Sequence, residues 1–191
     1  ADLGRHLSQS WRVVIAGKPN VGKSSLVNAL AGFRRAVVSE TPGTTRDVVL
    51  TSLAFDGWPV DLFDTAGMRE SEQSLEQQGI ALAKESIEKS DFCLWVVDTQ
   101  QAPSWPENLS VPVVRVINKI DLAPMWDLDT VEAIRVSAQT GEGIQTLADA
   151  IAHQCVPSSP QPGAAVPFSR EIVEWINETI ETGSWDWMTD W

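Results

Sequence analysis

The stretch Gly17-Lys-Pro-Asn-Val-Gly22-Lys23-Ser24 decides how the rest of the chain is interpreted. It follows the apolar run Arg12–Ala16 and precedes Ser24–Ala31, where the apolar residues recur at helical spacing. The pattern G-x-x-x-x-G-K-[ST] between a strand and a helix predicts a phosphate-binding loop. Its glycines let backbone N–H groups surround an anion, Lys23 brings a positive charge to the β- and γ-phosphates, and the Ser24 hydroxyl reaches Mg²⁺. The alternative is a glycine-rich turn without a ligand.

Runs rich in β-branched residues alternate with helical patterns along the chain. The predicted strands are Arg12–Ala16, Val48–Phe55, Val60–Phe63, Phe92–Val97, Val113–Ile117 and Ala133–Val136, and the predicted helices are Ser24–Ala31, Leu75–Lys89, Val131–Ala133 and Ile144–His153. This alternation predicts an α/β fold with a mostly parallel six-stranded sheet and helices on both faces. Asp56-Gly57 is a hairpin signal, so the second and third strands are predicted to be antiparallel at one edge of the sheet.

Composition excludes several classes of partner. The formal charge of −12 opposes direct binding to nucleic acid, and no apolar run approaches the roughly 20 residues of a membrane-spanning helix. The first ten residues resemble neither a signal peptide nor a transit sequence, so the expected location is cytoplasmic. Cys93 and Cys155 stand apart from any C-x-x-C or Cys/His cluster, which predicts two reduced thiols.

Composition also divides the chain into four parts. Residues 1–10 are a lead-in, residues 11–155 form the compact domain, residues 156–168 are a Pro-rich linker, and residues 169–191 hold a short amphipathic helix and a Trp-rich acidic tail. The tail Trp185-Asp-Trp-Met-Thr-Asp-Trp191 has two interpretations. It docks on a hydrophobic surface of this or another protein, or it is a frayed terminus.

A second phosphate-side motif follows the third predicted strand. In Asp64-Thr-Ala-Gly67 the carboxylate ends a strand, where it can hold Mg²⁺ through a water molecule. The Gly67 N–H can meet the γ-phosphate. A contact of that kind exists in one nucleotide state only, which predicts a switch.

A guanine-recognition motif, Asn118-Lys-Ile-Asp121, ends the fifth predicted strand. Asp121 offers two acceptors to the guanine N1–H and 2-amino group, whereas adenine would leave this carboxylate unpaired. Asn118 would tie the loop to the phosphate-binding loop, the Lys119 stem would lie along the base, and Ser137-Ala138 would close over its far edge. The predicted nucleotide contacts are Asn20, Val21, Gly22, Lys23, Ser24, Ser25, Asn118, Lys119, Asp121, Ser137 and Ala138.

These motifs are those of the translation-factor-related GTPases, and the chain from Trp11 to Gln154 resembles that superfamily. More narrowly, it resembles the G domain of the MnmE (TrmE) family of tRNA-modification GTPases. The stretches that carry this resemblance are Pro19–Gly32, Pro42–Asp47, and Asp64–Glu70 followed by Leu75–Ile80. Era-like and Der-like ribosome-assembly GTPases share the first two, and the third favours MnmE. The resemblance implies a Ras-like P-loop NTPase G domain that hydrolyses GTP to GDP with Mg²⁺.

The resemblance also implies how water is activated. Many small G proteins carry a water-positioning glutamine where this chain has Met68, which cannot hydrogen-bond a nucleophilic water. In MnmE-like proteins a glutamate on the following helix takes part, and the register from Asp64 places it at Glu76; the alternative is a solvated carboxylate. Thr45 would ligate Mg²⁺ together with Ser24 and Asp64. The predicted catalytic residues are Lys23, Thr45, Gly67 and Glu76.

Two further properties come with the resemblance. Asn20 matches the GTPases that bind K⁺ near the phosphates, where the cation would offset developing charge; the alternative is that Asn20 only shapes the loop. The switch regions, Arg34–Asp47 and Gly67–Gly79, would meet those of a second copy in the GTP state. Hydrolysis would then be coupled to homodimerisation.

The chain departs from the full MnmE pattern, which has a folate-binding domain and a surrounding helical domain. We expect either an excised G domain or a stand-alone relative that does not modify tRNA unaided. One alternative is a partner-dependent, nucleotide-switched binding module with weak hydrolysis and Pro157–Trp191 as its docking arm. Another is an Era-like or Der-like ribosome-assembly GTPase, which would need an RNA-binding domain that this acidic C-terminus does not provide.

Overall fold

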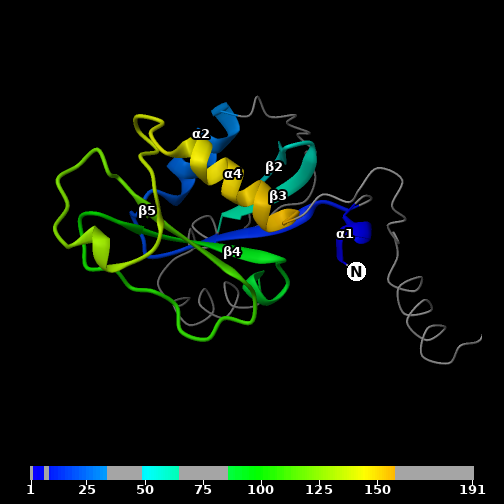
Figure 1. The fold of residues 1–191 in the computed structure, drawn as a ribbon, viewed down its shortest axis with the longest axis horizontal. Coiled ribbons are helices and arrows are strands. Elements are labelled where there is room, and N and C mark those ends of the chain that lie inside the picture. The colour runs from blue at the N-terminus through cyan, green and yellow to red at the C-terminus, as the bar shows by residue number, and fades with distance from the viewer. Residues whose placement is uncertain (1, 7–8, 34–48, 65–85, 158–191) are drawn as a thin grey trace, which may run out of the picture.

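The computed structural model describes residues 2–6, 9–33, 49–64 and 86–157 (Figure 1). These residues form a six-stranded sheet in the order β2-β3-β1-β4-β5-β6. Its strands are β1 (Trp11–Ala16), β2 (Val49–Phe55), β3 (Trp58–Asp64), β4 (Phe92–Asp98), β5 (Val113–Asn118) and β6 (Ile134–Arg135). All neighbouring pairs are parallel except β2 and β3, which confirms the predicted mixed sheet.

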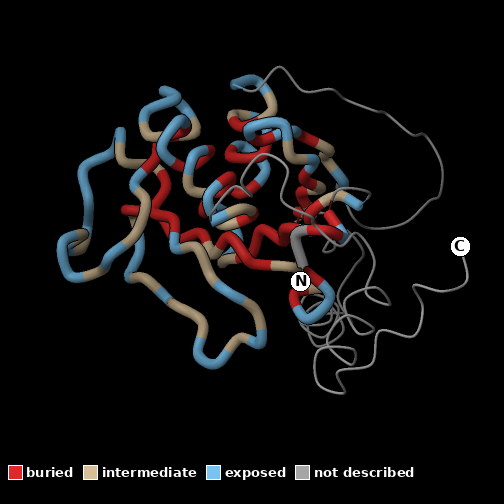
Figure 2. Tube along the Cα trace, turned by 45° about the vertical axis from the view of Figure 1, so that its right-hand side comes forward, coloured by how far each residue is buried: buried red, intermediate tan, exposed pale blue. Residues whose placement is uncertain are grey.

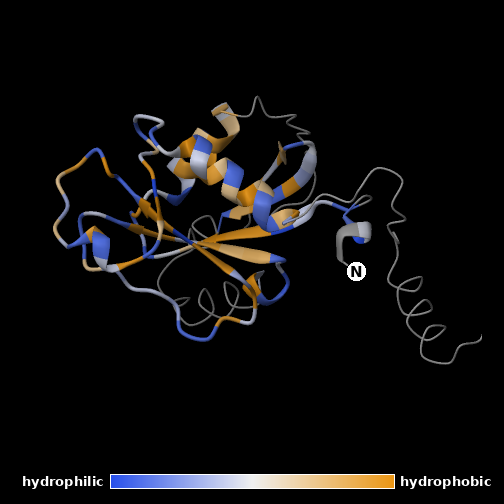
Figure 3. Cartoon of the chain, viewed as in Figure 1, coloured by the Kyte–Doolittle hydropathy of each residue, from blue (hydrophilic) through white to orange (hydrophobic). Residues whose placement is uncertain are grey.

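Strand β1 is an inner strand of the sheet and pairs with β3 along one edge and with β4 along the other. A strand covered on both faces needs apolar side chains throughout rather than in alternation. Val13, Val14 and Ile15 meet this need, and each is at most 1% exposed. The central strands accordingly form the apolar layer in Figure 3 and the buried one in Figure 2.

The antiparallel hairpin of β2 and β3 turns at Asp56-Gly57. Both residues have positive φ angles, 49° and 85°, as a two-residue turn of the type I′ class requires. Pairing then runs without interruption from Phe55↔Trp58 to Val49↔Asp64. The turn therefore sets the register that places Asp64 at the far end of β3.

Helices α2 (Lys23–Phe33) and α4 (Ile144–Cys155) cover one face of the sheet and pack against each other (Figure 1). Leu26 and Leu30 from α2 and Leu147 and Ile151 from α4 are fully buried in the shared core. The spacing of four residues within each pair puts its two members on one helix face. This packing fixes the start of α2 against the sheet, next to the phosphate-binding loop.

The opposite face carries a smaller apolar cluster. It contains the buried residues Val14, Ala16, Ile87 and Cys93. Of the predicted helix Leu75–Lys89, residues 86–88 are helical, Lys89 is in a turn, and residues 75–85 lie outside the described ranges. The described ranges hold no helix that is long and apolar enough to cross a membrane.

The predicted helix at Val131–Ala133 is wrong. The only turn of helix nearby is the 3₁₀ helix η2 (Leu128–Thr130), in which the Asp127 side chain accepts a hydrogen bond from Asp129 N–H, and Val131 is already extended at φ −138° and ψ 131°. Extended backbone suits a β-branched residue better than a one-turn helix. Residues 99–112, all described, also form no α-helix between β4 and β5; this segment contains three prolines, which remove backbone donors.

The short helix α1 (Asp2–Arg5) packs at the end of the sheet where β1 and β4 begin. The Arg5 guanidinium donates to Asp91 Oδ1 at 2.6 Å, and Asp91 Oδ2 accepts from Arg12 N–H at 2.7 Å. The His6 ring stacks on Trp11 with centroids 3.5 Å apart. These contacts join the lead-in to the compact domain.

Both cysteine thiols should be unreactive in the native protein. Burial raises the pKa of Cys93 and of Cys155 from 9.0 to about 12, so the thiolate that reacts is scarce near neutral pH. We expect modification by a water-soluble aromatic disulfide at pH 8 to be at least about 100-fold slower than in guanidinium chloride, as measured by release of the chromophore. Unfolding should become easier as pH rises from 9 towards 12, because the unfolded thiols ionise first. Stoichiometric labelling of the native protein within minutes would contradict this arrangement.

Candidate nucleotide-binding site

The polar residues of the site stand where the parallel strands end. Asp64 ends β3, Asp98 ends β4 and Asn118 ends β5. Strand pairing aligns Asp64 with Ile15 of β1 and Asp98 with Asn118. Ligands of open α/β sheets bind at this carboxyl edge, between neighbouring strands whose successors lie on opposite sides. Here these strands are β1, which is followed by β2, and β3, which is followed by β4.

The phosphate-binding loop joins β1 to α2 and opens onto a cavity of about 380 Å³. The cavity is lined by Asn20, Gly22, Lys23, Ser24, Ser25 and Lys119. The Lys23 ammonium donates to the carbonyls of Gly17 and Lys18 at 3.1 and 2.9 Å, which holds the side chain against its own loop. A buried ammonium at a helix N-terminus makes this cavity favourable for an anion.

Two oxygen ligands suited to Mg²⁺ meet beside this cavity. The Ser24 hydroxyl at the start of α2 donates to Asp64 Oδ2 at 2.5 Å. A hydroxyl and a carboxylate are hard oxygen ligands, and Mg²⁺ in nucleotide sites uses few protein ligands together with phosphate oxygens and water. Ser24 and Asp64 therefore fit the predicted metal site.

The base end is an adjoining cavity of about 410 Å³. It is lined by Gly22, Ser25, Asn118, Lys119, Asp121, Leu122, Ala138 and Gln139. The Ser137 hydroxyl donates to Asp121 Oδ1 at 2.5 Å and accepts from Thr140 N–H at 3.1 Å. This chain of hydrogen bonds fixes the orientation of the Asp121 carboxylate.

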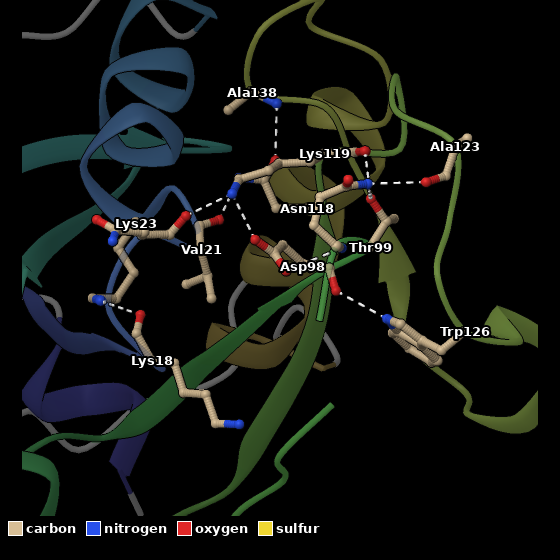
Figure 4. A network of polar contacts seen from close by, with 12 residues as sticks. Lys18, Val21, Lys23, Asp98, Thr99, Asn118, Lys119, Ala123, Trp126 and Ala138 are labelled. Atoms are coloured by element: carbon tan, nitrogen blue, oxygen red, sulfur yellow. Dashed lines mark hydrogen bonds and ion pairs between the residues drawn. The ribbon is translucent and has the colours of Figure 1, made fainter. Parts of the chain in front are cut away.

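Asn118 connects three loops through its amide (Figure 4). Its Nδ2 donates to the Val21 carbonyl at 2.9 Å, and its Oδ1 accepts from Ala138 N–H at 3.1 Å. The side chain is 2% exposed, so both bonds are made away from water, where an unpaired amide is costly. The phosphate-binding loop, the Asn118–Asp121 loop and Ala138 are thereby held as one unit.

Gly22 is placed where only glycine fits. Its φ is +90°, and a Cβ built there would lie 2.4 Å from Asn118 Nδ2. The missing side chain lets the loop approach the Asn118 amide closely.

Several predicted residues fall outside the described ranges. These are Thr45, Gly67 and Glu76, together with Met68 and both switch regions. Conversely, the sequence analysis did not identify Leu122, Gln139 or Asp98, all of which lie at or beside the base cavity. Leu122 and Gln139 directly follow the motif residues Asp121 and Ala138, and that adjacency is the signal that could have found them.

The fold is α/β with a mixed sheet, and its site combines a phosphate-binding loop, the oxygen ligands of Ser24 and Asp64, and the guanine-recognition motif Asn118–Asp121. These features together define a P-loop guanine-nucleotide-binding domain. The family model described as 50S ribosome-binding GTPase matches residues 12–122. The chain belongs to this family and is a GTPase.

The resemblance to MnmE is confirmed among curated proteins. The chain is 47% identical over 146 residues to the tRNA modification GTPase MnmE of Chlamydia caviae, covering 75% of this chain and 33% of that protein. It is 44% identical over 156 residues to MnmE of Methylococcus capsulatus, covering 77% and 35%. The chain thus spans about a third of the length of these relatives and corresponds to their G domain.

Solved structures agree on the fold. Era of Aquifex aeolicus, bound to GDP and aluminium fluoride, is 28% identical with a TM-score of 0.55, covering 78% of this chain and 58% of that chain. The G domain of the T. maritima FeoB iron transporter is 23% identical with a TM-score of 0.54, covering 76% and 99%. The Ras-like G-domain fold predicted from the motifs is confirmed.

Proposed function

We propose that this GTPase works as the G domain of a tRNA-uridine-modification protein in the cytoplasm, with K⁺-stimulated and dimerisation-coupled hydrolysis. The observation that carries the proposal is one continuous site with a phosphate end and a base end. The two cavities share Gly22, Ser25 and Lys119, so a ligand that fills both has a phosphate group and a base. The pathway rests on the names of the relatives and not on a tRNA contact within this chain.

Catalysis in this proposal depends on positioning and electrostatics. Lys23 holds the β- and γ-phosphates, and Ser24, Asp64 and Thr45 hold Mg²⁺. When bound, Mg²⁺ neutralises charge on the phosphate oxygens. Gly67 meets the γ-phosphate through its N–H, and Glu76 orients the attacking water.

Asn20 has two separable roles in the proposal. Its backbone is left-handed, with φ +65°, and its carbonyl accepts from the Lys119 ammonium at 2.6 Å, which supports a loop-shaping role. Asn20 also lines the phosphate cavity, which supports the K⁺ role. Both roles come from one residue, and substitution by glycine separates them because glycine keeps the left-handed backbone.

The deciding experiment measures GTP hydrolysis by the purified chain in KCl and in NaCl at matched ionic strength, over a range of protein concentrations. We expect K⁺ to accelerate turnover and the specific rate to rise with concentration. Slow turnover that depends neither on the cation nor on the protein concentration would favour a partner-dependent switch. Met68 is the residue that motivates this alternative, because its side chain cannot position water.

The variant Asn20→Gly should lose the acceleration by K⁺, with the ratio of the KCl and NaCl rates falling roughly tenfold or more towards one. GDP affinity in NaCl should change less than about threefold, because the loop conformation is kept. Steady-state rates and titration calorimetry check both outcomes. A retained K⁺ response would assign Asn20 to loop shape alone.

A further inference from the structure

Asp98, at the end of β4, holds an ion pair that the guanine-recognition motif does not include. Its Oδ2 accepts from the Lys119 ammonium at 2.5 Å, and its side chain is 1% exposed. The same ammonium donates to the Asn20 carbonyl at 2.6 Å (Figure 4 shows Asp98 beside Lys119). Lys119 therefore ends between the β4 carboxylate and the phosphate-binding loop.

The rest of Asp98 is held by neighbouring groups. Its Oδ1 accepts from Gln100 N–H at 3.2 Å, and its backbone carbonyl accepts from the Trp126 indole at 3.0 Å. The carboxylate thus has a fixed orientation. A fixed carboxylate can keep a flexible lysine side chain in one position.

Thr99 holds the backbone of the same lysine. Lys119 has φ +64°, a left-handed conformation that is unfavourable for a residue with a side chain. The Thr99 hydroxyl donates to the Lys119 carbonyl at 2.9 Å, and Thr99 N–H donates to the Asn118 carbonyl at 3.2 Å. Thr99 is fully buried, so these bonds are protected from water.

We propose that Asp98, supported by Thr99, is a specificity-determining positioning residue that keeps the Lys119 ammonium away from Asp121. Lys119 and Asp121 are two residues apart and line the same base cavity. An ammonium released from Asp98 can pair with the Asp121 carboxylate, which must stay available to the guanine N1–H and 2-amino group. The inference rests on guanine-nucleotide binding and is independent of K⁺ and dimerisation.

The test compares GDP with inosine diphosphate, which lacks the 2-amino group. The variant Asp98→Asn keeps the shape of the side chain and removes its charge. We expect the ratio of the two dissociation constants, measured by titration calorimetry, to fall about tenfold towards one. A general loosening of the phosphate-binding loop would weaken both nucleotides alike and leave the ratio unchanged, which would overturn the proposal.

A double-mutant cycle identifies the route of the effect. In the Lys119→Met background there is no ammonium to release, so Asp98→Asn should change the ratio less than about twofold. An equal fall in both backgrounds would overturn the proposal. The matched control is Asp129→Asn, which breaks a pair of the same 2.5 Å length to Arg135 at a site where Asp129 is 84% exposed, and which should leave the ratio unchanged.

If circular dichroism shows that Asp98→Asn is unfolded, variants of Thr99 test the proposal instead. Thr99→Val removes the donor to the Lys119 carbonyl and should lower the ratio about threefold, whereas Thr99→Ser keeps the donor and should match the parent protein. An unchanged ratio in Thr99→Val would overturn the proposal.

Discussion

Replacing Gly22 with alanine should lower the affinity for GDP by about 30-fold to several thousand-fold. The new Cβ would lie 2.4 Å from Asn118 Nδ2 on a backbone with φ +90°. Strained backbone costs about 1–2 kcal/mol, and breaking the buried Asn118 bond to the Val21 carbonyl costs about 1–3 kcal/mol more. Titration calorimetry with GDP measures the loss directly.

The same substitution at Gly32 is the matched control. Gly32 lies in α2, and a Cβ built there would have no neighbour within 4 Å. Alanine favours helix over glycine by up to about 1 kcal/mol, so Gly32→Ala should keep GDP affinity and leave thermal stability equal or slightly higher. Normal GDP binding by Gly22→Ala would show that the close approach to Asn118 is dispensable.

Replacing Asp121 with asparagine should exchange the preferred base from guanine to xanthine. Guanine presents two donors, N1–H and the 2-amino group, which match the two carboxylate oxygens; xanthine has a carbonyl in place of the amine, which matches an amide donor. The Ser137 hydroxyl donates to one oxygen of Asp121 and so fixes the orientation of this side chain. In the asparagine variant one of the two carboxylate oxygens is replaced by an NH₂ donor, which would face a donor of guanine. We expect GDP affinity to fall about 1000-fold while affinity for xanthosine diphosphate rises.

The measurement is the ratio of dissociation constants for GDP and xanthosine diphosphate. Asp149→Asn on the exposed part of α4 is the control and should leave this ratio unchanged. Retained guanine preference in Asp121→Asn would mean that another group in the cavity reads the base.

The features predicted from sequence are those encoded within a few consecutive residues. The phosphate-binding loop is a single eight-residue pattern between a strand and a helix. The hairpin is predicted by Asp56-Gly57, because few residue pairs adopt the positive φ angles that its turn requires. The central strands were also predictable from consecutive residues, because a strand that is covered on both faces is a continuous apolar run. The family then followed from the order of these short patterns.

Contacts between distant residues were predicted only where a motif residue takes part in them, as for Asn118 and the phosphate-binding loop. The ion pair of Asp98 was not predicted. Asp98 stands at the end of an apolar strand, where solvated carboxylates are common, and its partner Lys119 is 21 residues away in sequence. The helix predicted at Val131–Ala133 failed because three residues contain no complete helical period, so η2 and extended backbone formed there instead. Parallel strand pairing brings such segments together, and no local pattern records it.

The Asp56-Gly57 turn also offers a place to attach a probe. The turn is exposed, a Cβ built at Gly57 would meet nothing within 4 Å, and Asp64 stands at the opposite end of β3. Exposed turn tips accept inserted residues when the flanking pairs persist. A fluorophore, affinity tag or surface tether placed at this tip would report on the G domain or immobilise it from the side remote from the nucleotide.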